Sequence, residues 1–256
     1  MAELQGASSQ QRNIITLKWG SRYGVEYVNK LHAAVARNLS PPFRFVCFTD
    51  DANGLAPGIA HFSIPEIDLP LPAFVTGWRK LCLFRRDLPI SGQCLFLDLD
   101  LLITGRLDSF FEFEPEKIAI IQNWVHWRKR WFGRLPPIGN SSVFRFEANQ
   151  CGFVLDRFLG EKEWALANFR PPQSYLTHCI RDRMVFWPAE WVRSFKRHCR
   201  PIFPLNYLIE PHRPPEARIV AFHGKPDPDE AARGFRGRKI HHYSRPAGWI
   251  RELWEA

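Results

Sequence analysis

The stretch Cys94-Leu95-Phe96-Leu97-Asp98-Leu99-Asp100-Leu101-Leu102-Ile103-Thr104-Gly105 organises the rest of the chain. Its bulky apolar side chains, ending at Thr-Gly, predict a buried β-strand. Residues two apart on a strand point to the same face, so we expect the carboxylates of Asp98 and Asp100 to converge at the strand's end. Two carboxylates this close repel each other, and burying them without a counter-charge is costly. Because Mg²⁺ and Mn²⁺ prefer carboxylate oxygens, the pair predicts a divalent cation site, with two solvated acids at an exposed strand end as the alternative.

The composition predicts a globular protein. The chain has 256 residues, of which 45% are hydrophobic and 24% charged, enough for a substantial core. No stretch approaches the roughly 18 uninterrupted apolar residues of a membrane span, and the polar N-terminus lacks a signal peptide. The six cysteines form no C-x-x-C pair, which predicts reduced packing residues in a cytoplasmic protein.

The net charge of +9 favours an anionic partner. Nucleotide phosphates, acidic glycans, an anionic membrane face and nucleic acid all fit, and the charge does not choose among them. No nucleic-acid-binding motif is present, so we expect no nucleic-acid partner. The basic, aromatic cluster 127–134 is interpreted as part of a loop over the site, where it either contacts an acidic acceptor or lies on the surface.

The order of the predicted elements indicates a parallel α/β sheet. A strand at 13–18, a helix at 25–38 and a strand at 43–49 follow one another at the spacing of a strand–helix–strand unit. Further strands are expected at 59–64, 117–122, 141–146 and 217–222, and helices at 76–86, within 149–182 and at 249–254. The predicted domain organisation is a flexible N-terminus at 1–12, one main domain at 13–232 and a basic, aromatic tail at 233–256.

Polar residues gather where the predicted strands end. In open α/β sheets, ligands bind outside the carboxyl ends of the strands. Here those ends carry the acids Asp98 and Asp100, the basic residues Lys18 and Lys225, and the aromatic residue Trp19. The acids can bind a metal cation, the basic residues can bind phosphate, and the aromatic ring can stack on a base. Together they predict a metal–nucleotide site.

The segments G-W-R-K-L-C-L-F (77–84) and C-L-F-L-D-L-D-L-L-I-T-G-R-L-D-S-F-F (94–111) resemble glycosyltransferases of the GT-A fold. They are most similar to the retaining family of glycogenin and the bacterial lipopolysaccharide galactosyl- and glucosyltransferases (glycosyltransferase family 8). The resemblance implies a single α/β domain with a Rossmann-like, mixed or parallel central sheet flanked by helices. It also implies transfer of a hexose from a UDP-sugar to a glycan or glycolipid acceptor, with retention.

The resemblance implies a metal and diphosphate site. Asp98 and Asp100 match the D-x-D motif that binds Mn²⁺, or Mg²⁺, together with the donor diphosphate. His223 matches a late histidine that completes the metal shell, and Lys225 a lysine that contacts the diphosphate. The segment His223-Gly224-Lys225-Pro226 is shorter than the family's H-x-x-G-x-x-K-P. A surface or packed histidine is the alternative for His223.

The nucleotide site is implied by four further residues. Lys80 matches a helix lysine near the nucleotide, and Tyr23 falls where the family places an aromatic ring against uracil. Thr16 and Lys18 lie on the first strand beside it. A packing role for Tyr23 and a solvated helix face for Lys80 are the alternatives.

The transferred sugar is expected to contact two amides. Asn140 begins an N-S-S-V segment that resembles the family's sugar-binding segment, and Gln173 aligns with the glutamine of a D-Q pair near the anomeric carbon. The acid of that pair is replaced by Pro172. A plain turn residue is the alternative for Asn140, and a role without direct chemistry is the alternative for Gln173.

Other functions stay open beside the transferase. Pro172 makes a catalytically degenerate protein that only binds a sugar nucleotide plausible. Another metal-dependent nucleotide-sugar enzyme is the second alternative, although Trp19-Gly20-Ser21 is not the Gly-rich phosphate loop expected of a nucleotidyltransferase. We expect a cytoplasmic protein whose basic, tryptophan-containing C-terminus contacts the anionic inner face of a membrane.

Overall fold

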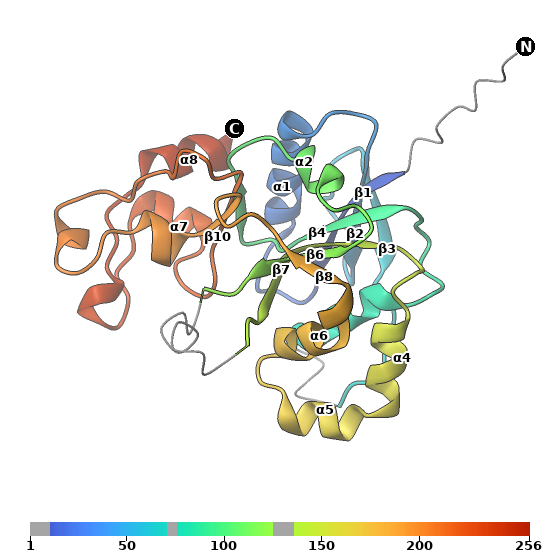
Figure 1. Ribbon diagram of the computed structural model, residues 1–256. Coiled ribbons are helices and arrows are strands. Elements are labelled where there is room, and N and C mark those ends of the chain that lie inside the picture. Colours follow the sequence, from blue (N-terminus) through green and yellow to red (C-terminus); the bar gives the residue numbers. More distant parts are fainter. Residues whose placement is uncertain (1–10, 71–75, 125–135) are drawn as a thin grey trace, which may run out of the picture.

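The computed structural model describes residues 11–70, 76–124 and 136–256 (Figure 1). Nearly all of the predicted N-terminal segment 1–12, and the basic cluster 127–134, lie outside the described residues. No helix of the described part is long and apolar enough to cross a membrane.

A seven-stranded mixed sheet forms the centre of the molecule, with the strand order β3-β2-β1-β4-β7-β6-β8. Strands β3, β2, β1 and β4 run parallel, whereas β7 is antiparallel to both of its neighbours, β4 and β6. The strands are β1 (Arg12–Lys18), β2 (Arg44–Thr49), β3 (Ile59–Ser63), β4 (Gln93–Leu97), β6 (Ile118–Gln122), β7 (Gly139–Glu147) and β8 (Met184–Phe186). The single mixed α/β domain expected from the sequence is confirmed.

Helices cover both faces of this sheet (Figure 1). One face packs against α1 (Val25–Asn38) and the short α2 (Ser109–Glu112). The other packs against the 3₁₀-helix η2 (Gly77–Phe84) and against α4 (Phe153–Gly160), α5 (Lys162–Asn168) and α6 (Pro172–Ile180). Side chains alternate between the faces, as on β1, where Ile14 points to α1 and Ile15 to η2. Burial on both faces explains why these strands are apolar throughout.

A second sheet of three short strands extends the fold beyond the main sheet. Its order is β5-β10-β9, from β5 (Leu101–Ile103), β9 (Val192–Ser194) and β10 (Ile219–Ala221). The helices beside it are α7 (Pro228–Arg233) and α8 (Gly248–Glu255). Ile250 and Trp254 of α8 are buried, and the Trp254 ring lies 5.0 Å from the Tyr27 ring of α1. The C-terminal helix therefore packs its apolar face onto the rest of the molecule.

The prediction of one strand through 94–105 was wrong. The run forms two strands, β4 and β5, which belong to different sheets, and the segment 98–100 is a bend between them. The bend is held at both ends, because the Asp98 amide donates to Ser142 O (2.9 Å) and the Phe222 amide donates to Asp100 O (3.0 Å). A carboxylate inside an apolar sheet would lose its hydration. The chain leaves the sheet where the acids occur, and both acids reach the pocket described below.

Most other predicted elements are confirmed, and the region 149–182 holds the three helices α4, α5 and α6. The segment predicted as a helix at 76–86 is a 3₁₀-helix. The elements that the sequence reading did not identify are all short: η3 (Arg181–Arg183), β8, β9, the π-helix η4 (Phe195–Cys199), η5 (Leu205–Tyr207), α2, α7 and η6 (Ile240–His242). All six cysteines are free, as expected, and five of them are buried.

Candidate active site

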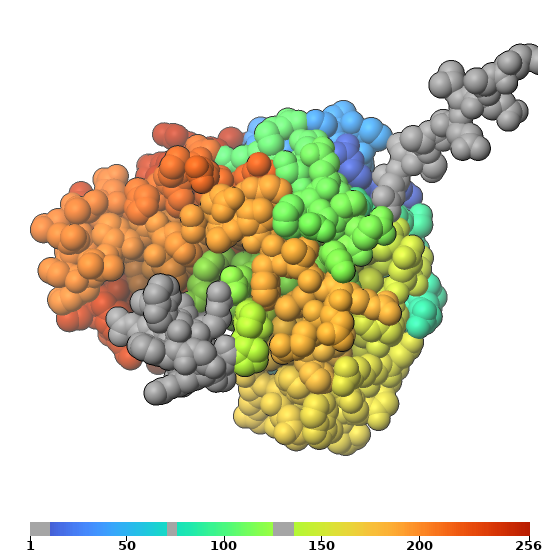
Figure 2. All heavy atoms as spheres, viewed as in Figure 1, coloured from blue at the N-terminus to red at the C-terminus, as the bar shows by residue number. Residues whose placement is uncertain are grey.

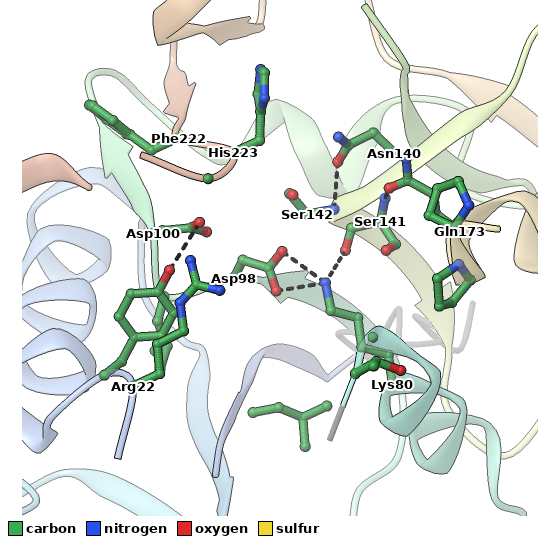
Figure 3. A pocket seen from close by; sticks show the side chains of 18 of the residues that line it. Arg22, Lys80, Asp98, Asp100, Asn140, Ser141, Ser142, Gln173, Phe222 and His223 are labelled. Atoms are coloured by element: carbon green, nitrogen blue, oxygen red, sulfur yellow. Dashed lines mark hydrogen bonds and ion pairs between the residues drawn. The ribbon is translucent and has the colours of Figure 1, made fainter. Parts of the chain in front are cut away.

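A cavity of about 540 Å³ opens at the carboxyl ends of β1 and β4, beside the bend that carries the two aspartates. Its lining brings together side chains from β1, η2, β7, α6 and the end of β10 (Figure 3). Seven of the ten residues predicted for the site line it: Tyr23, Lys80, Asp98, Asp100, Asn140, Gln173 and His223. The edge of the sheet therefore assembles most of the predicted set, although those residues are spread over two hundred positions of sequence.

Asp98 forms an ion pair with Lys80 on one side of the cavity. The ammonium nitrogen of Lys80 lies 2.7 Å from Oδ1 and 2.8 Å from Oδ2 of Asp98, and it also donates to the carbonyl of Ser141 at 3.0 Å. The Lys80 side chain crosses the Phe96 ring, with its nitrogen 4.9 Å from the ring centroid. Lys80 is thus a fixed cation in the wall of the cavity, not part of a solvated helix face.

Asp100 has no such ion pair among the described residues. Its Oδ2 lies 3.3 Å from the Tyr23 hydroxyl, which is also 3.3 Å from Oδ1 of Asp227. The phenol has a single proton, so it can donate to only one of the two acids. Burial, with the nearby charge of Asp98, raises the pKa of Asp100 to about 7, although Lys80 opposes the shift. Burial and the charge of Asp100 also raise the pKa of Tyr23, which stays a neutral donor.

This raised pKa predicts a stability change in the variant Asp100→Asn. The folded pKa of about 7 exceeds the unfolded value of about 3.9, so the wild type loses stability as pH rises between them. The amide has no charge to bury and avoids this loss. In EDTA, we expect the Tm of Asp100→Asn to exceed that of the wild type at about pH 8, by a margin that shrinks toward about pH 5. Thermal denaturation of both proteins at the two pH values measures this. If the Tm difference between Asp100→Asn and the wild type were the same at both, the raised pKa of Asp100 would be contradicted.

The opposite wall of the cavity presents amides and hydroxyls from β7 and α6. The Asn140 side-chain oxygen accepts from the Ser142 amide (2.9 Å), and Gln173 Oε1 accepts from the Ser141 amide (3.4 Å). The β6–β7 pairing shifts register between Ile120 and Ile121, opposite this segment. These bonds orient two neutral polar side chains into the cavity, as Figure 3 shows.

His223 lines the cavity but makes its contacts on the far side from the aspartates. Its Nε2 is 2.7 Å from the hydroxyl oxygen of Ser194, and its ring stacks on Trp124, with centroids 5.7 Å apart. Burial and the charge of Lys196 lower the pKa of His223 to about 4, so the imidazole is neutral at pH 7. In Figure 3 the ring lies apart from both carboxylates.

A divalent cation fits the carboxylate side of this donor set. Asp98 and Asp100 offer hard oxygen ligands, and a bound cation would offset both the burial and the nearby charge of Asp98 that raise the pKa of Asp100. Within the described residues, however, no group of three or more histidine, cysteine, aspartate or glutamate side chains is arranged to hold a metal. His223 is a neutral imidazole, but here it is bonded to Ser194. The described arrangement thus provides two ligands for the ion rather than three.

Three predicted residues do not line the cavity. Thr16 is fully buried, and its hydroxyl donates to the carbonyl of Leu97 (2.8 Å), at the start of the bend. Lys18 is buried behind the strand end and donates to the carbonyl of Asp51 (3.4 Å). Lys225 lies 2.8 Å from a carboxylate oxygen of Asp227 and 2.8 Å from one of Glu230. Their roles at the nucleotide or the diphosphate stay predictions.

The structure adds two residues, Arg22 and Asp227, that the sequence reading did not place at the site, and it places Trp19 and Trp124 in the wall of the cavity, as expected from a strand end and a loop over the site. Arg22 and Trp19 line the cavity beside Tyr23, and the Arg22 guanidinium lies 5.0 Å from the Tyr23 ring centroid. Trp124 follows β6 and forms part of the wall near His223. Asp227 reaches Tyr23 from the start of α7, where it forms a capping box with Glu230. The D-P-D-E sequence at 227–230 is a signature of that box, so this helix start was detectable.

Comparisons with known proteins identify the fold. No protein-family model matches the chain, and no curated protein matches it. Among solved structures, it is similar to a galactosyltransferase, LgtC, in complex with donor and acceptor sugar analogs, with 13% identity, a TM-score of 0.59 and 95% of each chain covered. The chain has a glycosyltransferase fold. This likeness confirms the expected architecture.

Two further solved structures agree. The glycosyltransferase GlyE of Streptococcus pneumoniae TIGR4 has 14% identity and a TM-score of 0.57, with 96% of this chain and 60% of that chain covered. The bifunctional glycosyltransferase WbbM has 9% identity and a TM-score of 0.57, with 86% of this chain and 47% of that chain covered. The chain therefore aligns with nearly the full length of LgtC. It aligns with only about half to three fifths of the length of the other two proteins.

Proposed function

We propose that this protein is a glycosyltransferase that moves a hexose from a UDP-sugar to a glycan or glycolipid acceptor, with retention and with Mn²⁺ or Mg²⁺ as cofactor. One observation carries the proposal: Asp98, Asp100 and Lys80 share one cavity at the carboxyl ends of the strands. The fold around that cavity is also found in a galactosyltransferase in complex with donor and acceptor sugar analogs. Acids beside a fixed cation suit a metal-bound diphosphate.

The divalent cation would be held by Asp98 and Asp100. Bound there, it would supply Lewis-acid chemistry that neutralises negative charge on the departing diphosphate. His223 is proposed as a third ligand on the resemblance alone. An ion on Asp98 competes with Lys80, because the ammonium group contacts both carboxylate oxygens.

Other residues of the cavity would bind the donor and stabilise the charge on its leaving group. Lys80 and Arg22 place positive charge along the cavity where charge develops on the leaving group. Tyr23 and Trp19 offer rings for the base. Gln173 cannot accept a proton as a general base, so it would orient the sugar, as would Asn140. Retention by attack from the side of the leaving group needs no protein nucleophile, which agrees with these neutral amides beside the sugar.

A second candidate function is a protein that binds a sugar nucleotide without transferring the sugar. One observation favours it: Pro172 lines the cavity next to Gln173, where the resembling family has an acid. A proline has no polar side-chain atom with which to orient a sugar or assist its transfer. Donor hydrolysis by the purified protein separates the two candidates, because a pure binder does not turn over the donor.

Ligand-dependent stabilisation tests the nucleotide site. We expect UDP with Mn²⁺ to raise the Tm by roughly 5 °C or more when the nucleotide is near 100 times its Kd, because a ligand that binds only the folded state shifts the unfolding equilibrium. UDP in EDTA should raise it less, because the diphosphate then meets the carboxylates of Asp98 and Asp100 with only Lys80 paired to one of them. Thermal-shift measurements with UDP, ADP and inorganic phosphate, each with and without Mn²⁺, make the comparison. Stabilisation by no nucleoside diphosphate, with or without the metal, would sink the proposal.

A further inference from the structure

A cluster of exposed apolar side chains, here called the apolar knob, surrounds η5. Large hydrophobic residues are mostly buried in this protein, and seven of the nine exposed ones in the described part of the chain belong to the knob. Ile202 and Leu208 are the most open, with 78% and 73% of their surface exposed. The members are Ile202, Phe203, Leu205, Tyr207, Leu208, Ile209 and Ile240. An apolar patch of this kind on a soluble surface marks an interaction site.

Hydrogen bonds and ring stacking fix the conformation of the knob. Asn206, at its centre, is fully buried and donates to the carbonyl of Tyr243 (2.9 Å). The rings of Tyr207 and Tyr243 stack with centroids 4.4 Å apart, and the Tyr207 hydroxyl donates to the carbonyl of Ile240 (3.1 Å). The polar residue thus points inward and the aliphatic residues outward, the reverse of an ordinary surface turn. Local contacts hold the apolar side chains in solvent.

The sequence segments that contain the knob are rich in basic residues and poor in acids. Of the chain's 35 basic and 26 acidic residues, ten basic and one acidic lie in 193–213 and 233–245, which leaves 25 of each sign in the remainder. These two segments therefore sum to a formal charge of +9, and the charges of the remainder sum to zero. Arg236, Arg238 and Lys239 are exposed next to Ile240, and Arg197 is exposed on η4. The only acid, Glu210, lies 4.0 Å from Arg245.

The knob projects at one end of the molecule. The orange chain around 200–210 forms the left end in Figure 1, and orange spheres cover that end in Figure 2. Helices α4 and α5, in yellow, lie at a different end, below the main sheet. A flat surface of large extent could therefore touch the knob without meeting α4 or α5.

We propose that the apolar knob inserts into the interfacial region of a lipid bilayer that contains anionic lipids. Aliphatic side chains bordered by arginine and lysine suit a surface that is apolar below and negatively charged above. Nucleic acid would use the same charges, but it stacks bases on aromatic rings and gains little from isoleucine and leucine. A protein partner would have to be strongly acidic around an apolar centre.

The assignment differs from the expected contact through the C-terminal helix. The apolar face of α8 is occupied, because Ile250 and Trp254 are buried against the protein and the Trp249 indole donates to the carbonyl of Pro211 (2.9 Å). From the predicted tail, the basic residues at 236–239 and Ile240 are exposed, and Arg245 donates to the carbonyl of Tyr207 in the knob (3.5 Å). The proposal does not depend on the proposed enzymatic function, since the knob lies outside the cavity.

Vesicle flotation tests the proposal, with phosphatidylcholine vesicles that contain or lack phosphatidylglycerol. We expect the full chain to float with the anionic vesicles and less with the neutral ones. Leu208→Ser should weaken binding about tenfold, because one leucine no longer leaves water. The matched control is Leu159→Ser, which removes an exposed leucine of α4 and should bind like the wild type. Replacing Arg236, Arg238 and Lys239 by glutamine should reduce the preference for anionic vesicles.

Several outcomes would overturn the assignment. One is equal binding to both kinds of vesicle, or none, by the wild type. Another is flotation of Leu208→Ser at the wild-type level. A dimer in light scattering that Leu208→Ser converts to a monomer would assign the knob to self-association instead. Because the changed residues are exposed, unchanged Tm and unchanged Tm shifts with UDP and Mn²⁺ are expected for every variant, so a failure here is distinguishable from a failure at the cavity.

Discussion

Asp100→Asn is expected to lower turnover of a UDP-sugar at least about 100-fold while the protein stays folded. Asp100 lines the cavity and has no ion pair with a described basic residue, so its charge is available to a cation. Asparagine keeps the size of the side chain and a hydrogen-bond acceptor for Tyr23, but removes the charge. Hydrolysis of UDP-glucose and UDP-galactose in Mn²⁺ measures the effect.

A matched control keeps this test specific. Asp156→Asn also removes one carboxylate, but that residue lies on α4, is largely exposed and pairs with Arg86 at 2.6 Å. Because exposed ion pairs contribute little to stability, the control should keep both its Tm and its donor turnover. If Asp100→Asn turned the donor over like the control, a catalytic cation at the aspartate bend would be untenable.

The strand–helix–strand start of the fold was predictable because local periodicity and tertiary burial agree there. In α1, Val28, Leu31, Ala34 and Val35 follow the helical period and all are buried. The run around Asp98 was harder to interpret, because a buried strand and two buried strands joined by a bend have the same apolar pattern. The acids were the signal: they mark where the chain leaves the sheet. Elements of three residues, such as β9, have no periodicity to detect.

The candidate site was predictable where residues follow long strands and unpredictable where distant segments converge. Asp98 follows β4 and Asn140 lies at the start of β7, and the strand order brings these two positions to one edge of the sheet, where Lys80 reaches them from η2. The neighbours of Lys225 were not predictable in this way. The D-x-x-E capping box at the start of α7 places two carboxylates on its ammonium group, and that pairing depends on local helix geometry rather than on strand order.

Lys80→Met is expected to separate metal binding from turnover. The ammonium group contacts both oxygens of Asp98, so its removal frees that carboxylate and leaves more negative charge at the bend. Mn²⁺ should then bind several-fold more tightly. Donor turnover should nevertheless fall about 100-fold, because the fixed charge that would stabilise the leaving diphosphate is lost. Titration with Mn²⁺ and donor hydrolysis measure the two effects, and methionine keeps the apolar length that packs against Phe96.

The control for Lys80 is Arg86→Met, which removes an exposed cation just beyond the same helix, where it pairs with Asp156. That variant should match the wild type in both measurements. If Lys80 only held Asp98 in place, Lys80→Met would instead lose Mn²⁺ affinity along with turnover, and its Kd for UDP in EDTA would not change. Weaker UDP binding without metal, together with tighter Mn²⁺ binding, requires that Lys80 contact the diphosphate itself. Those two opposite shifts cannot both arise from a general loosening of the bend, because loosening would weaken every ligand held there.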